Sequence, residues 1–139
     1  IITSVRDTTD TWTRAQNTIG VTNAGGSGSG LLMRVAYVCG LAEEFVEAYF
    51  EGRCVVTTDT NNAYVGIGVD STSTISGTRG IWQFGSYNGS LRGNYQGIPG
   101  LGSHFLQAME QTGATTGTVT YSGDAGGNFQ NSLVATLMM

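Results

Sequence analysis

The sequence predicts an all-β fold, a jelly-roll β-sandwich, and three observations support this prediction. Val, Ile, Thr, Tyr, Phe and Trp, which favour strands, recur in short runs along the 139-residue chain. Glycine, of which there are 22, divides these runs together with Asn and Asp and supplies the backbone angles of tight turns. Good helix formers are scarce, and lysine is absent. About nine or ten short strands with frequent turns are typical of a sandwich or jelly roll.

Charge and length limit the class of protein. The formal net charge is -4, only 12% of the residues are charged, and the six basic residues are arginines spread along the chain. Because the sequence contains no basic patch, we expect no nucleic-acid partner. No apolar run approaches the roughly 20 residues of a membrane-spanning helix, so we expect no membrane insertion. A chain of this length can bury enough surface to form one domain.

The first 30 residues are predicted to form an N-terminal segment that ends in a glycine and serine run at 25–30. This run offers no side chains to bury, so it indicates a boundary or a surface loop, with the β-sandwich following over residues 31–139. It matches neither the dinucleotide-binding glycine motif nor the nucleophile elbow of hydrolases. The chain begins without methionine or a signal sequence, so we expect a domain cut from a longer polypeptide.

Residues 31–40 alternate as a strand does and are mostly apolar on both faces. One face includes Tyr37 and Cys39, and the other includes Val38. One of the two faces is predicted to meet the core, and the other is expected to meet something else, such as a neighbouring subunit.

Residues 41–51 fit a helix or a strand. Leu41, Phe45 and Tyr49 recur at the four-residue spacing of a helix face. In a helix, however, glutamates at four-residue spacing would be like-charged neighbours one turn apart. A strand would instead place Val46, Ala48 and Phe50 inside, and we predict a strand. Gly52 is then predicted to make a tight turn into a strand at 53–58.

A turn at 59–62 is predicted to lead into the most regular strand of the chain, residues 63–69. Its inward face would carry Ala63, Val65, Ile67 and Val69. Its other face carries Gly66 and Gly68, and two glycines on one face allow another backbone or an aromatic ring to approach closely.

The chain between residues 70 and 102 is predicted to be rich in loops, with one short strand at 81–84 followed by a long polar stretch. A second set of strands is predicted at 103–111, 115–122 and 129–137.

The two cysteines and the single histidine form no familiar metal-ligand pattern, so we expect no metal and no cofactor. Oxygen ligands at 59–62 or 70–73 could be imagined around calcium, but neither segment fits an EF-hand loop. Cys39 and Cys54 are predicted to be buried free thiols rather than a disulfide.

Three side chains are candidates for a catalytic role. His104 could act as a base, but its place in an alternating strand favours a hydrogen-bonded histidine within a sheet. Glu110 and Asp124 are the least implausible pair of catalytic carboxylates, although such groups are usually solvated or cap a turn. We therefore expect a protein that is not an enzyme.

The aromatic and amide side chains of residues 81–96 favour a binding surface. Tyr and Trp rings can stack on sugars while Asn, Gln and Arg bridge hydroxyl groups, but the same composition suits a protein interface or an ordinary surface loop. The candidate glycan or receptor contacts are Trp82, Tyr87, Asn88, Arg92, Asn94 and Tyr95. Asn88 also begins a glycosylation sequon, which matters only if the host glycosylates the chain.

Several segments together resemble a known family. They are residues 11–13 (TWT), 64–71 (YVGIGVDS), 100–106 (GLGSHFL) with Glu110, and 118–126 (TVTYSGDAG). These segments look like the C-terminal domains of bacteriophage tail fibres, tailspikes and related virion fibres. The resemblance covers most of the chain from Thr11 onward and rests on loose β-sandwich signatures, with no catalytic motif among them. It implies a trimeric jelly roll similar to the C1q and tumour-necrosis-factor folds, located in the virion.

The leading hypothesis is a non-enzymatic, homotrimeric fibre-tip domain that binds a host cell-surface receptor, a glycan or a protein. Avidity across three sites would strengthen weak sugar recognition. One rival is an assembly domain that trimerises a tailspike whose active site lies upstream. A second is a secreted C1q-like or cytokine-like ligand with a disulfide between Cys39 and Cys54. A third is a glycan hydrolase that uses Glu110 and Asp124.

Overall fold

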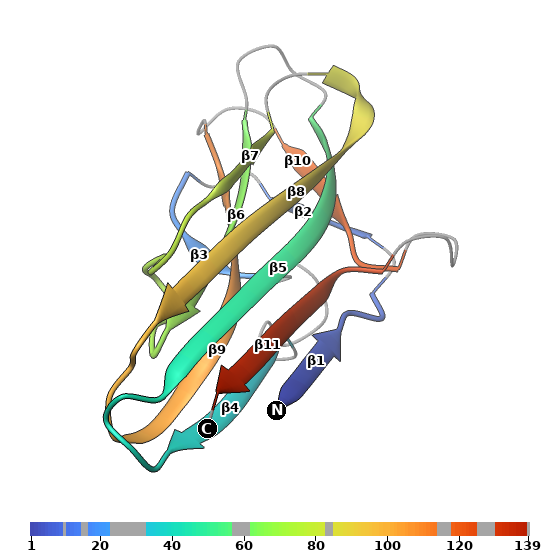
Figure 1. Ribbon diagram of the computed structural model, residues 1–139. Coiled ribbons are helices and arrows are strands. Elements are labelled where there is room, and N and C mark those ends of the chain that lie inside the picture. The colour runs from blue at the N-terminus through green and yellow to red at the C-terminus, as the bar shows by residue number, and fades with distance from the viewer. Residues whose placement is uncertain are drawn as a thin grey trace.

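The computed structural model describes residues 1–9, 11–14, 17–22, 33–56, 62–82, 85–113, 118–124 and 130–138. It confirms the predicted all-β jelly-roll sandwich: these residues form two antiparallel sheets (Figure 1). The strands are β1 Ile2–Arg6, β2 Thr11–Arg14, β3 Gly20–Val21, β4 Arg34–Cys39, β5 Phe45–Val56, β6 Ala63–Val69, β7 Gly80–Trp82, β8 Gly85–Gly97, β9 Gly102–Thr112, β10 Val119–Ser122 and β11 Ser132–Met138. Among the residues described, no helix is long and apolar enough to cross a membrane.

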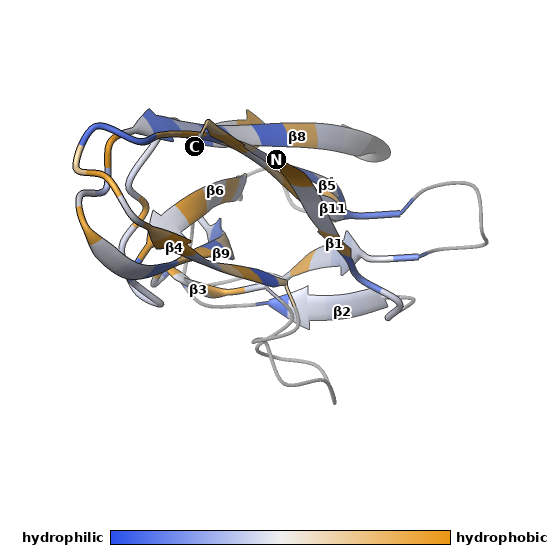
Figure 2. Cartoon of the chain, turned by 60° about the horizontal axis from the view of Figure 1, so that its bottom comes forward, coloured by the Kyte–Doolittle hydropathy of each residue, from blue (hydrophilic) through white to orange (hydrophobic). Residues whose placement is uncertain are grey.

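Each sheet is built around one long strand. In the six-stranded sheet, one edge of β5 pairs with β11 and then with β10, and its other edge pairs with β8. Beyond β11 lies β1, and beyond β10 lies β2. In the five-stranded sheet, β9 pairs with β4 and β3 on one edge and with β6 on the other, and β7 follows β6. Figure 2 shows the sheets edge-on, with β8, β5 and β11 in one layer and β6, β9 and β4 in the other.

The predicted strand at 41–51 is confirmed from Phe45 onward, whereas residues 41–44 form a turn before it, and the predicted turn at Gly52 is wrong. β5 continues through Gly52, which pairs with Leu91 of β8. Val46 and Phe50 are almost completely buried, as the strand prediction required. A Cβ atom at position 52 would lie 3.4 Å from the Val65 side chain of the opposite sheet. Gly52 therefore serves close packing between the layers and not a change of chain direction.

The polar stretch after residue 84 was predicted to be loop, and this prediction is wrong. Residues 85–97 form β8, the longest strand of the sandwich. Its buried face carries Gly89, Leu91 and Gly93, while the residues between them are exposed. Small residues leave little hydrophobic alternation in the sequence, so the pattern that normally predicts a strand is missing.

The predicted strand at 63–69 and the role of its glycines are confirmed. Val65 and Ile67 are fully buried in the core between the sheets. On the other side of β6, a Cβ atom at Gly66 would collide with Ile75, and one at Gly68 with the backbone oxygen of Ser71. The segment after β6 therefore folds back over the outer face of its own strand, which only glycine allows at this distance.

The described residues of the N-terminal segment belong to the same two sheets. β1 pairs with β11, β2 with β10, and β3 with β9. The glycine and serine run at 25–30 and the boundary predicted after it lie outside the described residues. Cys39 and Cys54 are buried and free, as predicted, and burial raises the pKa of the Cys54 thiol to about 12.

Exposed aliphatic side chains gather at one end of the sandwich, the end that holds both termini of the chain (Figure 1). Cys39 pairs with Gly102, Val46 with Gly97 and Phe45 with Met138, so the connections between these strands lie together. The exposed side chains are those of Ile1, Ile2, Val38, Leu41, Ile98, Leu101 and Met138. We call this set the apolar end. Val38 is 64% exposed within it, so the face of residues 31–40 that carries Val38 is the one that does not meet the core.

Candidate functional site

The outward face of the β5–β8 strand pair carries an unbroken row of polar side chains. Its members are Ser90, Arg92, Asn94 and Gln96 on β8, and Glu47, Tyr49 and Glu51 on β5. We call these seven residues the polar face. The antiparallel register places Gln96 opposite Glu47, Asn94 opposite Tyr49, and Arg92 opposite Glu51. Because side chains directly opposite each other in such a pair lie about 5 Å apart, each can contact its partner.

Contacts between the members hold the polar face in place. Gln96 Nε2 donates to Glu47 Oε1 at 2.8 Å, and Ser90 Oγ donates to a Glu51 oxygen at 3.2 Å. Arg92 Nε donates to Asn94 Oδ1 at 3.3 Å, and the guanidinium carbon lies 4.0 Å from the centre of the Tyr49 ring. Side chains that are already held in place lose less conformational entropy when a ligand binds.

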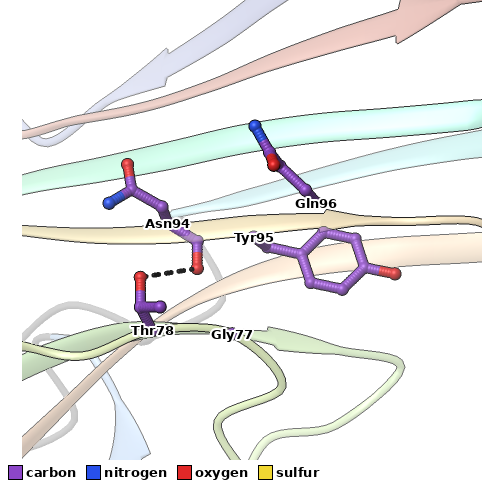
Figure 3. A pocket seen from close by; sticks show the side chains of 5 residues that line it. All are labelled: Gly77, Thr78, Asn94, Tyr95 and Gln96. Atoms are coloured by element: carbon purple, nitrogen blue, oxygen red, sulfur yellow. Dashed lines mark hydrogen bonds between the residues drawn. The ribbon is translucent and has the colours of Figure 1, made fainter.

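A pocket of about 470 Å³ adjoins the polar face. Its lining residues are Gly77, Thr78, Asn94, Tyr95 and Gln96 (Figure 3). Thr78 and Asn94 exchange two backbone hydrogen bonds, of 2.8 and 3.2 Å, and Thr78 Oγ1 donates to the Asn94 carbonyl at 3.4 Å. These bonds fix the segment before β7 against β8, and residues of both segments line the pocket.

The six predicted contact residues fall into four groups. Arg92 and Asn94 lie on the polar face, and Asn94 also lines the pocket. Tyr95 points to the opposite side of β8 from Asn94 and Gln96, as Figure 3 shows, and its half-buried ring lines the pocket. Burial acts first to raise the pKa of the Tyr95 phenol, with Asp70 and Cys39 adding to it, so the phenol stays neutral and can both donate and accept.

Trp82 belongs to the packing of the sandwich. Its half-buried ring packs against the core, and it lies so close to Gly89 that a Cβ atom there would collide with it. Tyr87 and Asn88 belong to β8, but their side chains lie outside the part that the structure describes. Of the predicted site residues whose side chains are described, Arg92, Asn94 and Tyr95 are the ones that lie at the polar face and its pocket.

Sequence analysis did not select the polar-face residues of β5 or the pocket residues Thr78 and Gln96. One signal was available for β5. Placing Val46, Ala48 and Phe50 inside also places Glu47, Tyr49 and Glu51 outside. That these side chains lie beside Arg92 follows from the pairing of β5 with β8, which no local pattern reveals.

His104 joins three segments at the apolar end. Its Nδ1 lies 2.7 Å from Asp70 Oδ2, and its Nε2 lies 3.2 Å from the Gly100 carbonyl oxygen. The Phe105 amide donates to the other Asp70 oxygen at 2.8 Å. Carboxylate and carbonyl oxygens only accept, so the imidazole fits this place best as the doubly protonated ion. The prediction of a hydrogen-bonded sheet histidine is confirmed.

The pair makes a pH-dependent contribution to stability. The hydrogen bond to Asp70 raises the pKa of His104, although burial opposes this. For Asp70, burial acts to raise the pKa, but the hydrogen bonds from His104 and Phe105 outweigh it and the pKa is lowered. The His104 contribution is complete below about pH 6.5 and is lost as the pH rises through the raised pKa. The Asp70 contribution is complete above about pH 3.9 and is lost as the pH falls through the lowered pKa.

We therefore expect the single imidazole of the chain to titrate above about pH 6.5 in the folded protein. Replacing its partner in Asp70→Asn should move the pKa of His104 back toward that value. An NMR titration of the imidazole carbon-bound protons measures both. An identical titration in the two proteins would contradict the ion pair.

Glu110 is inside the sandwich, where no substrate reaches it. Its side chain is completely buried, and its two oxygens accept from Trp12 Nε1 at 2.8 Å and Arg14 Nη1 at 3.4 Å. Trp12 also stacks on Tyr121, with ring centres 6.0 Å apart. Asp124 donates its backbone amide to the Thr9 carbonyl in a turn. Glu110 thus links the two sheets, and this geometry gives no support to the hydrolase hypothesis.

Among the residues described, no three His, Cys, Asp or Glu side chains gather in a way that could hold a metal ion. Asp70, one end of the calcium segment considered from the sequence, is occupied by His104 and Phe105. The segment 59–62 lies, apart from Asn62, outside the described residues.

Comparisons with known proteins bear on the fold. No protein-family model matches the sequence, and no curated protein is significantly similar to it in sequence. The solved structure of infectious bursal disease virus, Gt strain, is similar over 99% of this chain and 32% of that chain, with 8% identity and a TM-score of 0.52. The chain therefore spans about a third of the viral chain, and at this identity the likeness concerns the fold alone.

Two further solved structures match over most of both chains with lower TM-scores. A CBM35 domain from Cellvibrio japonicus Abf62 is 12% identical, with 98% of this chain and 93% of that one covered and a TM-score of 0.40. The C-terminal domain of EclA, described as a sugar-binding protein, is 8% identical, with 94% and 79% covered and a TM-score of 0.38.

Proposed function

We propose that the polar face and its adjoining pocket bind carbohydrate. The observation that carries this proposal is the exposed row of side chains held by mutual contacts beside a pocket. Sugar hydroxyl groups both donate and accept hydrogen bonds. The row offers guanidinium and amide donors together with amide and carboxylate acceptors, so it can satisfy both roles at neighbouring positions.

The chemistry of the polar face suits a sugar better than a protein partner. The buried centre of a protein interface is depleted of charged residues and is anchored by large apolar or aromatic side chains. The polar face carries three charged side chains, and its one ring, Tyr49, is covered by the Arg92 guanidinium. Most of the large exposed aliphatic side chains lie at the apolar end instead.

The wider role that we propose is attachment of a virion fibre to a host cell-surface glycan, as a homotrimer. The sequence resemblance to phage fibre tips supports this role, and the sandwich fold is compatible with it. The apolar end supplies a surface for self-association. Exposed side chains such as Val38 and Leu101 are about two-thirds accessible there, and burying apolar area drives association. The polar face runs along β5 and β8 from Gln96, two residues before Ile98 of the apolar end, to Ser90 farther from it.

The experiment compares wild-type protein with Arg92→Ala and Asn94→Ala in calorimetric titrations against capsular and lipopolysaccharide O-chain preparations from candidate host bacteria. Light scattering of the same samples across a dilution series should give three times the 14.5 kDa chain mass. Each substitution is expected to weaken glycan binding about tenfold or more, because a hydrogen bond to a charged or amide group is worth about 1–3 kcal/mol.

Arg34→Ala is a matched control. Arg34 lies on β4 of the other sheet, with its guanidinium carbon 4.0 Å from the Phe105 ring centre and its Nε donating to Gln107 Oε1 at 2.9 Å. Like the loss of Arg92, the loss of Arg34 removes one contact with an aromatic ring and one hydrogen bond to a side-chain amide. It should nevertheless leave glycan binding unchanged. Equal binding by all the proteins would refute the site, and no binding to any glycan would refute the function. Trp82→Ala is a poor probe because it also removes core packing.

A further inference from the structure

We infer that the polar face binds an internal stretch of a linear, uncharged polysaccharide. This inference rests on the proposed function and adds to it the class of glycan and the way the glycan is held. Three observations carry it: the length of the row of side chains, the open shape of the pocket among the described residues, and the balance of charge.

The row is long compared with one sugar ring. Ser90, Arg92, Asn94 and Gln96 are all exposed and alternate along one straight strand. With about 3.3 Å per residue, the row extends for roughly 20 Å. Every position along it presents a hydrogen-bonding group, so contacts can continue from one sugar to the next along a chain.

The pocket is open to solvent rather than enclosed by its described lining residues. These described residues come from β8 and from the two residues Gly77 and Thr78. Thr78 and Asn94 exchange backbone hydrogen bonds, and Figure 3 shows the further bond from Thr78 Oγ1 to the Asn94 carbonyl. A site for a small ligand usually encloses 70–90% of the ligand surface. This pocket cannot surround a chain end in that way, and the polar face continues past it along β8. A polysaccharide can therefore enter at one end of the row and leave at the other.

The polar face carries no excess of positive charge. Glu47 and Glu51 accept from an amide and a hydroxyl group, so neither of these bonds neutralises them. Arg92 supplies one positive charge, and Arg53, the next outward residue of β5 beside the polar face, supplies a second that balances the two carboxylates. An anionic sugar needs an excess of donors and positive charge, which this surface does not supply.

The remaining hydrogen-bonding groups suit hydroxyls. Arg92 Nε donates to Asn94, and both terminal guanidinium nitrogens are left without a hydrogen-bond partner among the described residues. Gln96 uses its amide nitrogen for Glu47, which leaves its carbonyl oxygen as an acceptor. Free donors at Arg92 and a free acceptor at Gln96 thus lie on the same strand, and a chain of hydroxyl groups can use both.

The test uses oligosaccharides of two to six sugars from linear glucans, mannans and xylans, with oligogalacturonates of equal length as acidic counterparts. Affinity for at least one neutral series should rise with length, the hexamer binding at least tenfold more tightly than the dimer. Blocking either chain end should leave the hexamer affinity unchanged. Ser90→Ala and Gln96→Ala, at the two ends of the row, should weaken hexamer binding several-fold with little effect on the dimer, and Arg34→Ala should change neither.

The outcomes separate the inference from the proposed function. A dimer that binds as tightly as its hexamer, loss of binding on blocking a chain end, or preference for the galacturonates would overturn the inference while carbohydrate binding stands. Binding of host polysaccharide preparations without binding of any neutral linear series would also overturn it. Failure of every glycan, host preparations included, would overturn the proposed function itself.

Discussion

Replacing Arg14 by methionine is expected to lower the free energy of unfolding by about 3–5 kcal/mol. Arg14 is 7% exposed and lies 3.4 Å from the completely buried Glu110 carboxylate. Methionine has a similar length but no charge, so the carboxylate would remain inside the sandwich with the Trp12 N–H but without its counter-charge. Breaking a buried pair by removing one partner is costly because it strands the other charge. Arg14 also donates to the Thr18 carbonyl at 2.9 Å, and this bond is lost too.

Urea unfolding measures this effect as a lower midpoint at an unchanged slope. The double variant Arg14→Met with Glu110→Gln is the control. The neutral amide can still accept from Trp12 but needs no counter-charge, so the double variant should recover about 1–2 kcal/mol of the loss. A loss below about 1 kcal/mol in Arg14→Met would show that the pair contributes little.

Replacing Gly93 by alanine is expected to lower the free energy of unfolding by about 3 kcal/mol, at the upper end of overpacking effects. Gly93 of β8 faces β6 of the opposite sheet across the core. A Cβ atom at Gly93 would lie 2.6 Å from Gly66 Cα and 3.1 Å from the Val65 carbonyl oxygen. Both are backbone atoms, so the clash cannot be relieved by a rotamer change and β8 itself must move.

Gly40→Ala is the matched control for this variant. A Cβ atom at Gly40 would meet only the Glu44 carboxylate, at an ordinary 3.8 Å. Its thermal midpoint should stay close to that of the wild-type protein, while Gly93→Ala unfolds several degrees lower. Because Asn94 neighbours Gly93, we also expect weaker glycan binding by Gly93→Ala well below its unfolding temperature. Equal midpoints for the two variants would contradict the close approach of the sheets.

Much of the fold was predictable because its signal is local. The strand at 63–69 carries large apolar residues at every second position, and the inner set at 46–50 decided between strand and helix in the same way. β8 was not predicted as a strand because glycines replace the large residues on its inner face. The prediction of a turn at Gly52 was wrong for a related reason. Glycine occurs both in tight turns and where strands pack closely, and the sequence does not distinguish the two.

The candidate site was predictable only on one of its two strands. Arg92, Asn94 and Tyr95 were selected because aromatic, amide and guanidinium groups concentrate near them. Their neighbours Tyr49 and Glu47 are more than 40 residues away in the chain and meet them through the register of β5 and β8. The long-range pairing of strands is set by the whole core, so composition near one strand cannot reveal it.

The position of β11 has a consequence for how the chain folds. β11 lies between β1 and β5, and among the described strands it is the only one with which β1 pairs. The ribosome makes β11 more than 120 residues after β1. During synthesis, β1 and the edge of β5 next to β11 therefore stay unpaired until β11 is made. Until then two strand edges are open to pairing with other chains, which is a hazard for aggregation. Such non-local pairing also makes folding slow, on the millisecond to second scale of β-sandwiches.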